Sequence, residues 1–256
     1  MTAPGGVCSV VRWADGRSVH DSNGFVTALA VREVRRAGKT VPEAWLDLLE
    51  TCRRPNGSYG FWPYGATPAW APELPADSDD TAVMLLELAR AGRVSRTEAR
   101  SVACHTVGAH RLRRVLDPGP PWLRQGMFTT WHRRGAGRDI DLVDLTAATN
   151  VLALLYSLGL QQIPGVEETL AGLTTGLGWA ASSAARWQSL SPFYPEPDEL
   201  ARALDHATQC GVRGLTDGAR TARQVCPRQS LDAVCSMAYG PPIWHSSDLA
   251  AIRRTA

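Results

Sequence analysis

The sequence predicts an all-α protein built from repeated helical hairpins, and three observations support this prediction. Apolar segments that open with an acidic residue and close at glycine recur along the chain at a nearly constant interval. Segments with more charge lie between them and also have helical patterning. No segment alternates apolar and polar residues convincingly enough to predict a strand.

The apolar segments carry the start and stop signals of helices. The three clearest ones span residues 21–38, 77–92 and 141–159. An aspartate at a helix start accepts hydrogen bonds from free backbone N–H groups and interacts favourably with the helix dipole. A glycine at the end tolerates the left-handed conformation of a helix stop. We therefore expect helix starts at four places: Asp21, Asp77, Asp141 or Asp144, and Asp198.

The intervening segments predict a second helix in each repeat. They span residues 41–51, 96–114 and 166–187. A helix that is apolar on nearly every side, as over residues 146–158, is buried on most sides. An inner ring of apolar helices within an outer ring of more charged ones would account for both kinds of segment. The inner helices would then all start at one mouth, where their aspartates would converge.

Length and composition exclude several classes of protein. The 256 residues suffice for a single domain over 1–256, and 27 basic against 25 acidic residues leave a net charge of +2. This balance gives no electrostatic case for nucleic acid or an anionic membrane. No apolar run reaches the ~18 residues of a membrane-spanning helix, and the first residues lack a secretion signal. We expect a cytoplasmic protein whose six scattered cysteines are reduced.

The second repeat opens with an unusual cluster of acids, Asp77-Ser78-Asp79-Asp80-Thr81-Ala82. Asp77 has the position of a helix cap. The first repeat has Asn23 and Gly24 where the second has Asp79 and Asp80. The fold itself therefore does not require these two acids, and they are the best candidates for chemistry.

This motif resembles the Asp-x-Asp-Asp-Thr-Ala motif of the squalene–hopene and class II terpene cyclase superfamily. The stretch from Trp45 to Trp62, with its Asn56-Gly57-Ser58-Tyr59-Gly60 turn, is similar to that family's repeat, although its Gln is not cleanly present. The resemblance implies an (α/α) toroid, complete or incomplete. It also implies proton-initiated cyclisation of an isoprenoid or prenylated substrate. By position, Asp79 would be the general acid and Asp77 and Asp80 its supporting carboxylates.

The chemistry of such a reaction requires a buried acid and an aromatic wall. An alkene is a very weak base, and burial beside other carboxylates keeps an acid protonated. Aromatic faces stabilise the resulting cation by up to ~2 kcal/mol or more when desolvated. The candidate substrate-binding residues are Trp62, Tyr64, Trp70, Phe128, Trp131, Asn150, Phe193 and Tyr194. Asn150 would face the cavity if Thr146 does.

The resemblance leaves the cofactor and the assembly open. No cofactor is required, and Mg²⁺ is expected only if the substrate carries a diphosphate. Candidate arginines for that group are Arg133, Arg134 and Arg138, which precede the third acidic start. Members of the family usually have two helical barrels, whereas this chain has room for one. A homo-oligomer or a partner chain could complete the cavity.

Three alternatives remain at this point. The chain could be a non-catalytic toroid module that binds an apolar ligand or a partner protein, or a toroid enzyme of other chemistry. Cys104, His105 and His110 could bind zinc, although they lie on an expected outer helix. The second acidic cluster, Asp139, Asp141 and Asp144, is best interpreted as helix caps and a solvated turn.

Overall fold

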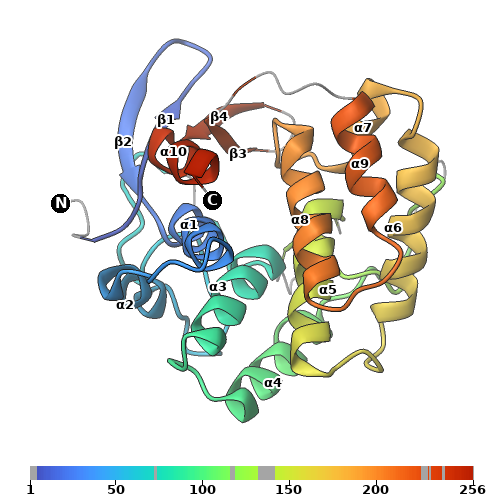
Figure 1. Cartoon of the computed structure of the whole chain (residues 1–256), viewed down its shortest axis with the longest axis horizontal. Coiled ribbons are helices and arrows are strands. Elements are labelled where there is room, and N and C mark those ends of the chain that lie inside the picture. The colour runs from blue at the N-terminus through green and yellow to red at the C-terminus, as the bar shows by residue number, and fades with distance from the viewer. Residues whose placement is uncertain are drawn as a thin grey trace.

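The computed structural model of the chain has a mixed α/β fold (Figure 1). It describes residues 5–71, 74–115, 119–131, 142–225, 230, 232–237 and 240–255. Helices make up 51% of it and a four-stranded antiparallel sheet another 12%. The prediction of an all-α toroid is therefore wrong, because the two ends of the chain pair as strands.

The sheet joins two hairpins from opposite ends of the sequence. The strands are β1 (Cys8–Arg12), β2 (Ser18–Ser22), β3 (Ala233–Met237) and β4 (Gly240–His245), in the spatial order β2-β1-β4-β3. The central pairing of β1 with β4 places Val11 opposite Trp244. Figure 1 shows this sheet beside α10 (Ser247–Thr255), which packs on both β1 and α1.

The local sequence does not predict strands β1 and β4, and the structure shows why. Ser9 interrupts the apolar positions of β1, yet it is buried and its hydroxyl donates to the carbonyl of Asp21. Pro241 and Pro242 argue against a central strand because proline cannot donate to a sheet ladder. They are accommodated because β1 pairs with β4 over Ile243–His245, beyond both prolines.

The helices pack in consecutive pairs. The first helices of four pairs are α1 (Gly24–Arg36), α3 (Ser78–Arg90), α5 (Leu145–Leu158) and α8 (Pro197–Gln209). Their partners are α2 (Glu43–Thr51), α4 (Arg96–His105), α6 (Val166–Ala180) and α9 (Thr216–Val225). The short helices η1 (Val107–Ala109) and α7 (Ala184–Leu190) extend α4 and α6. Helix α3 lies between α1 and α5, and α5 lies between α3 and α8.

The helix starts follow the expected capping chemistry in two cases and depart from it in two others. Asp77 caps α3 and Asp144 caps α5 through their side chains. Asn23, and not Asp21, caps α1, since Asp21 still belongs to β2. Helix α8 begins after Glu196, so that its expected start at Asp198 lies in the first turn.

Two of the deeply buried helices, α3 and α5, position the candidate site. Every residue from Ser78 to Leu88 of α3 is buried, and so is every residue from Leu145 to Leu155 of α5. Their N-termini carry the acidic residues that the sequence singles out. In the described part of the chain, no helix is both long and apolar enough to cross a membrane.

Candidate active site

The acidic motif occupies the buried N-terminus of α3. The Asp77 carboxylate accepts a hydrogen bond of 2.6 Å from the backbone N–H of Asp80 and so caps the helix. Asp79 and Asp80 lie in the first turn, where the helix dipole favours negative charge. Both are buried, with exposed fractions of 6% and 3%. Acids at this depth require partners or must keep their protons.

Asp79 has hydrogen-bond partners for both of its oxygens. Asn150 on α5 donates from Nδ2 to Oδ1 at 2.7 Å. The hydroxyl of Tyr194, which precedes α8, donates to Oδ2. Burial raises the pKa of the Asp79 carboxyl, although the hydrogen bonds from Tyr194 and Asn150 oppose this rise. The carboxyl is thus held in place from two elements that follow α3 in the sequence.

The other carboxyls of the cluster add to its proton affinity. Burial and the charge of Asp79 raise the pKa of Asp77 well above its ordinary value. Burial and the charges of Asp77 and Asp79 do the same for Asp80. Burial raises the pKa of Asp144 to about 7, against the opposing hydrogen bond from the Phe193 N–H. Closely spaced buried carboxylates cannot all ionise, so the cluster retains protons near neutral pH.

A pocket opens directly in front of this cluster. It is lined by Asp77, Asp79 and Asp80 together with six aromatic residues, which are Phe25, Phe61, Trp131, Phe193, Tyr194 and Trp244. The space between these side chains, counted together with its open mouth, is about 510 Å³. The remaining lining is mostly apolar, with Leu74, Ala147, Cys235 and Met237 among it. The arrangement places an acid against an aromatic and aliphatic wall.

Four of the eight predicted substrate-binding residues lie at this site. Trp131 and Phe193 line the pocket and contact each other edge to face, with ring centroids 5.3 Å apart. Tyr194 lines the pocket and donates to Asp79. Asn150 also donates to Asp79 and lines a second pocket on α1 and α8.

The other four neither line the pocket nor contact Asp79 through a hydrogen bond. The Trp62 indole is buried and donates to Asp21 at 3.0 Å, and Trp70 packs edge to face against it. Phe128 is 1% exposed, and its ring packs against Gly165 in the core. Tyr64 is 63% exposed. The first three fill gaps between elements, which is a common role for aromatics at helix junctions.

Three aromatic residues of the pocket are not among the predicted substrate-binding residues. Phe25 opens α1, Phe61 precedes the predicted Trp62, and Trp244 comes from β4. Trp244 donates from its indole nitrogen to Oδ2 of Asp21 at 2.9 Å, which fixes the ring at the pocket. The pairing of β1 with β4 brings Trp244 there, and no local pattern predicts that pairing.

Several predicted candidates cannot be placed or do not gather. Arg133, Arg134, Arg138, Asp139 and Asp141 lie outside the described residues. Within the described ranges, no three His, Cys, Asp or Glu side chains form a group that could hold a metal ion. Cys104 and His105 are exposed, and His105 Nδ1 lies 2.8 Å from the carbonyl oxygen of Ser101 on the same helix.

Comparisons with known proteins add little to this geometry. No family model matches the chain, and no curated protein matches it. A crystal structure of a protein from Actinoplanes is similar at a TM-score of 0.45 and 17% identity, over 99% of this chain and 69% of that chain. A likeness of this size carries no functional argument.

Proposed function

We propose that the chain is an acid-catalysed cyclase in which Asp79 protonates an isoprenoid-type substrate held in the aromatic pocket. The observation that carries the proposal is the position of a proton-retaining carboxyl cluster at the wall of a pocket with six aromatic side chains. The resemblance of Asp77–Ala82 to the class II terpene cyclase motif supports the same chemistry.

The proposed reaction is an isomerisation whose atoms balance without a redox partner. Asp79 donates its proton to a carbon–carbon double bond, which loses its π bond and becomes a carbocation. A second double bond attacks this cation and closes a ring. The last cation then loses a proton to a base, which completes the isomerisation. If water adds instead, the resulting oxonium loses the proton and the product is a hydrated cyclic alcohol. The aromatic faces stabilise the cationic stages.

In the protonation step, the protein positions the acid through the hydrogen bonds from Asn150 and Tyr194. They hold the Asp79 carboxyl in one orientation, which general acid catalysis requires. The Tyr194 hydroxyl can also accept, so it can partner Asp79 whether or not Oδ2 carries the proton. The assistance of Mg²⁺ remains a prediction for substrates that carry a diphosphate.

The proposal is tested by product analysis with a panel of polyprenyl substrates. Farnesyl diphosphate, geranylgeranyl diphosphate and squalene are incubated with the purified chain in D₂O, with and without Mg²⁺. We expect a cyclic isomer with one deuterium at the initiating carbon. Asp79→Asn should lower its rate by at least about 10²-fold, since general acids contribute 10²–10⁴-fold. Exposed Asp15, replaced by Asn, is the matched control.

Two results would contradict the proposal. One is cyclisation by Asp79→Asn at the rate of the unsubstituted chain. The other is saturable binding of the panel, seen by quenching of tryptophan fluorescence, without turnover of any member. That second result would support the alternative of a non-catalytic module for apolar ligands.

A further inference from the structure

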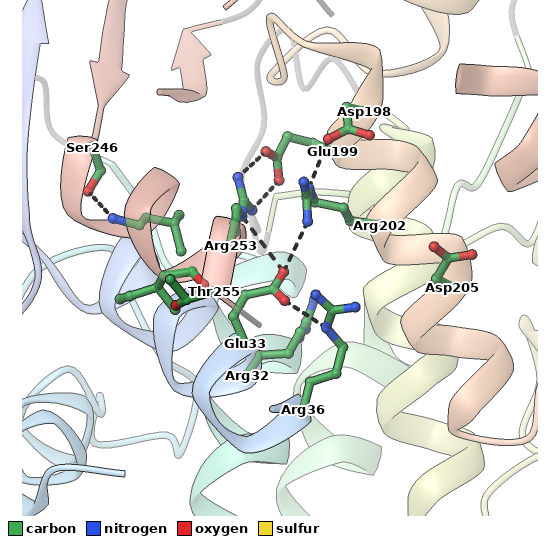
Figure 2. A network of polar contacts seen from close by, with 12 residues as sticks. Arg32, Glu33, Arg36, Asp198, Glu199, Arg202, Asp205, Ser246, Arg253 and Thr255 are labelled. Atoms are coloured by element: carbon green, nitrogen blue, oxygen red, sulfur yellow. Dashed lines mark hydrogen bonds and ion pairs between the residues drawn. The ribbon is translucent and has the colours of Figure 1, made fainter. Parts of the chain in front are cut away.

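A second pocket lies next to the Asp79 hydrogen bonds and is rich in arginine. Asn150 and Tyr194, the two donors to Asp79, both line it. Its volume, including the mouth, is about 560 Å³. Five arginines line this arginine pocket, namely Arg32, Arg36, Arg202, Arg223 and Arg253. Figure 2 shows four of them between α1, α8 and α10.

Each carboxylate that lines the arginine pocket already accepts a hydrogen bond from an arginine of the same pocket. Glu199 accepts two hydrogen bonds from Arg253, at 2.5 and 2.8 Å. Glu33 accepts one from Arg36 at 2.8 Å, and Asp205 accepts one from Arg223 at 2.7 Å. The lining has five arginines and three carboxylates, and Asp198, next to the lining, also pairs with Arg202 and Arg223. For Arg32, the ion pair is a long one, with the Glu87 carboxylate 3.9 Å from its Nε.

Arg32 is buried, with an exposed fraction of 8%, and only part of its guanidinium is satisfied. Its Nη1 donates to Oδ1 of Asn150 at 3.0 Å. Among the described residues, Nε and Nη2 have no hydrogen-bond acceptor. The Glu87 carboxylate lies 3.9 Å from Nε and already pairs with Arg35 and Arg90. A buried cation with two unused donors is costly unless something else accepts from it.

Two further buried donors in the same pocket also lack acceptors. His206 Nε2 lies 2.9 Å from Arg90 Nη1, and because a guanidinium only donates, Nε2 accepts and the proton is on Nδ1. That Nδ1 has no hydrogen-bond acceptor in the described part of the chain. Arg253 Nε has none within hydrogen-bond distance either, since the Glu33 carboxylate beside it is 3.7 Å away. The unused groups of Arg32, His206 and Arg253 are therefore all donors. A ligand that satisfies them must supply several acceptor oxygens.

We propose that the arginine pocket binds a phosphate-type oxyanion, whose oxygens accept hydrogen bonds from Arg32, His206 and Arg253. Arginine is suited to this ligand because its planar fork matches a phosphate edge. Arg36 and Arg223 are partly exposed at the rim, with side-chain exposures of 43% and 44%, and attract an anion from solvent. The oxyanion is either free phosphate or the phosphate group of a small ester, and these two share the same contacts.

The proposal does not depend on cyclisation. It does predict a connection to Asp79, because Asn150 accepts from Arg32 and donates to Asp79. An anion at Arg32 would thus contact a residue that is hydrogen-bonded to Asn150. Asn150 in turn is a hydrogen-bond partner of Asp79. Loss of cyclase activity alone would leave phosphate binding intact, so failures of the two proposals are distinguishable.

The test is calorimetric titration of the full chain with inorganic phosphate, in a sulfate-free buffer of constant ionic strength set with sodium chloride. We expect one phosphate per chain and a melting temperature that rises with phosphate concentration. Arg32→Gln should weaken binding at least tenfold, and His206→Gln and rim Arg36→Gln severalfold. Exposed Arg186→Gln, on α7, should leave the affinity unchanged. Near-ultraviolet circular dichroism shows whether each variant is folded.

A parallel titration with glycerol phosphate separates the two sources of the oxyanion. Tighter binding of the ester than of inorganic phosphate would assign the pocket to a phosphorylated small molecule, and the reverse would assign it to free phosphate. The proposal is overturned if neither compound binds more tightly than chloride at equal ionic strength. It is also overturned if folded Arg32→Gln, or folded His206→Gln and Arg36→Gln together, bind phosphate as the unsubstituted chain does. Buried water would then be what satisfies the donors.

Discussion

The indole nitrogen of Trp244 donates a hydrogen bond of 2.9 Å to Asp21, 223 residues earlier in the chain. The same carboxylate accepts from the Trp62 indole at 3.0 Å and from the Asn23 amide at 2.8 Å. Asp21 thus connects the end of β2 to the cap of α1, to the turn that carries Trp62, and to β4. This contact holds the Trp244 ring at the wall of the candidate active site.

Replacement of Asp21 by Asn should therefore destabilise the whole chain. An amide has one acceptor oxygen in place of two, so a buried indole N–H loses its partner. A buried donor without a partner costs about 1–3 kcal/mol, and more when a charged acceptor is lost. We expect the free energy of unfolding in urea to fall by about 2–3 kcal/mol. Exposed Asp47→Asn, the control, should change it by less than about 0.5 kcal/mol.

A second prediction concerns the hydrogen bond between Asn150 and Asp79. Loss of this donor in Asn150→Leu should raise the Asp79 pKa further, because the hydrogen bond favours the ionised form. If Asp79 is the acid of a cyclase, the alkaline limb of the kcat/KM profile then moves to higher pH. The maximal rate should fall about tenfold from poorer positioning. The control is Thr149→Val, because the Thr149 hydroxyl donates to the carbonyl of Leu145 and not to Asp79; it should keep the original profile. An alkaline limb that does not move in Asn150→Leu would show that Asn150 does not tune the Asp79 pKa.

The pH dependence of stability tests the buried acids without any substrate. Because burial raises the pKa of Asp80, the folded chain binds more protons than the unfolded chain above pH ~3.9. The contribution of Asp80 to the free energy of unfolding therefore falls as pH rises from ~3.9 towards the pKa of Asp80 in the folded chain. Asparagine does not titrate, so Asp80→Asn should gain stability relative to the unsubstituted chain between pH 5 and pH 8. The gain should grow as pH rises through this window, and urea unfolding at each pH measures it.

Two features of this measurement separate Asp80 and its carboxyl neighbours from the other titrating groups. The pKa of buried His206 is lowered, which by itself makes stability rise with pH, but His206 is present in both chains and cancels in the difference. Asp15→Asn is the control of opposite sign, because the Arg17 contacts lower the Asp15 pKa and confine its effect to acidic pH. A stability difference for Asp80→Asn that stays constant from pH 5 to pH 8 would show that Asp80 is ionised throughout.

Local chemistry determined what the sequence could predict here. Asp77 could be predicted as a helix cap, and Asp144 as one of two candidates for the next cap beside Asp141, because a cap acts on the next three residues. Asp21 was misassigned because strand β2 continues to Ser22 and the cap role passes to Asn23. The strands themselves depend on pairing between chain ends, which short-range patterns do not encode.

In the candidate site, too, the residues set by local sequence could be predicted and those brought in by long-range contacts could not. The acids and the Phe193-Tyr194 turn were predicted, since they adjoin helix starts that the sequence marks. Phe25 and Trp244 were not, because their place in the pocket follows from α1 and β4 meeting in the folded chain. Trp62 was predicted for the pocket, yet it is its neighbour Phe61 that lines it, because the Trp62 nitrogen is bound by Asp21.

A final prediction separates aromatic residues that bind substrate from those that only pack. Phe193 lines the pocket against Trp131, whereas Phe128 is buried against Gly165. Phe193→Leu should leave stability within about 0.5 kcal/mol, but raise KM or lower kcat about tenfold, as expected for the loss of an aromatic face. Phe128→Leu should instead lower the free energy of unfolding by about 1–2 kcal/mol through the space it leaves. Its kcat/KM should be that of the unsubstituted chain, measured well below its melting temperature. Equal losses of activity in both variants would mean that the pocket wall extends to Phe128, and a loss in neither would place the substrate elsewhere.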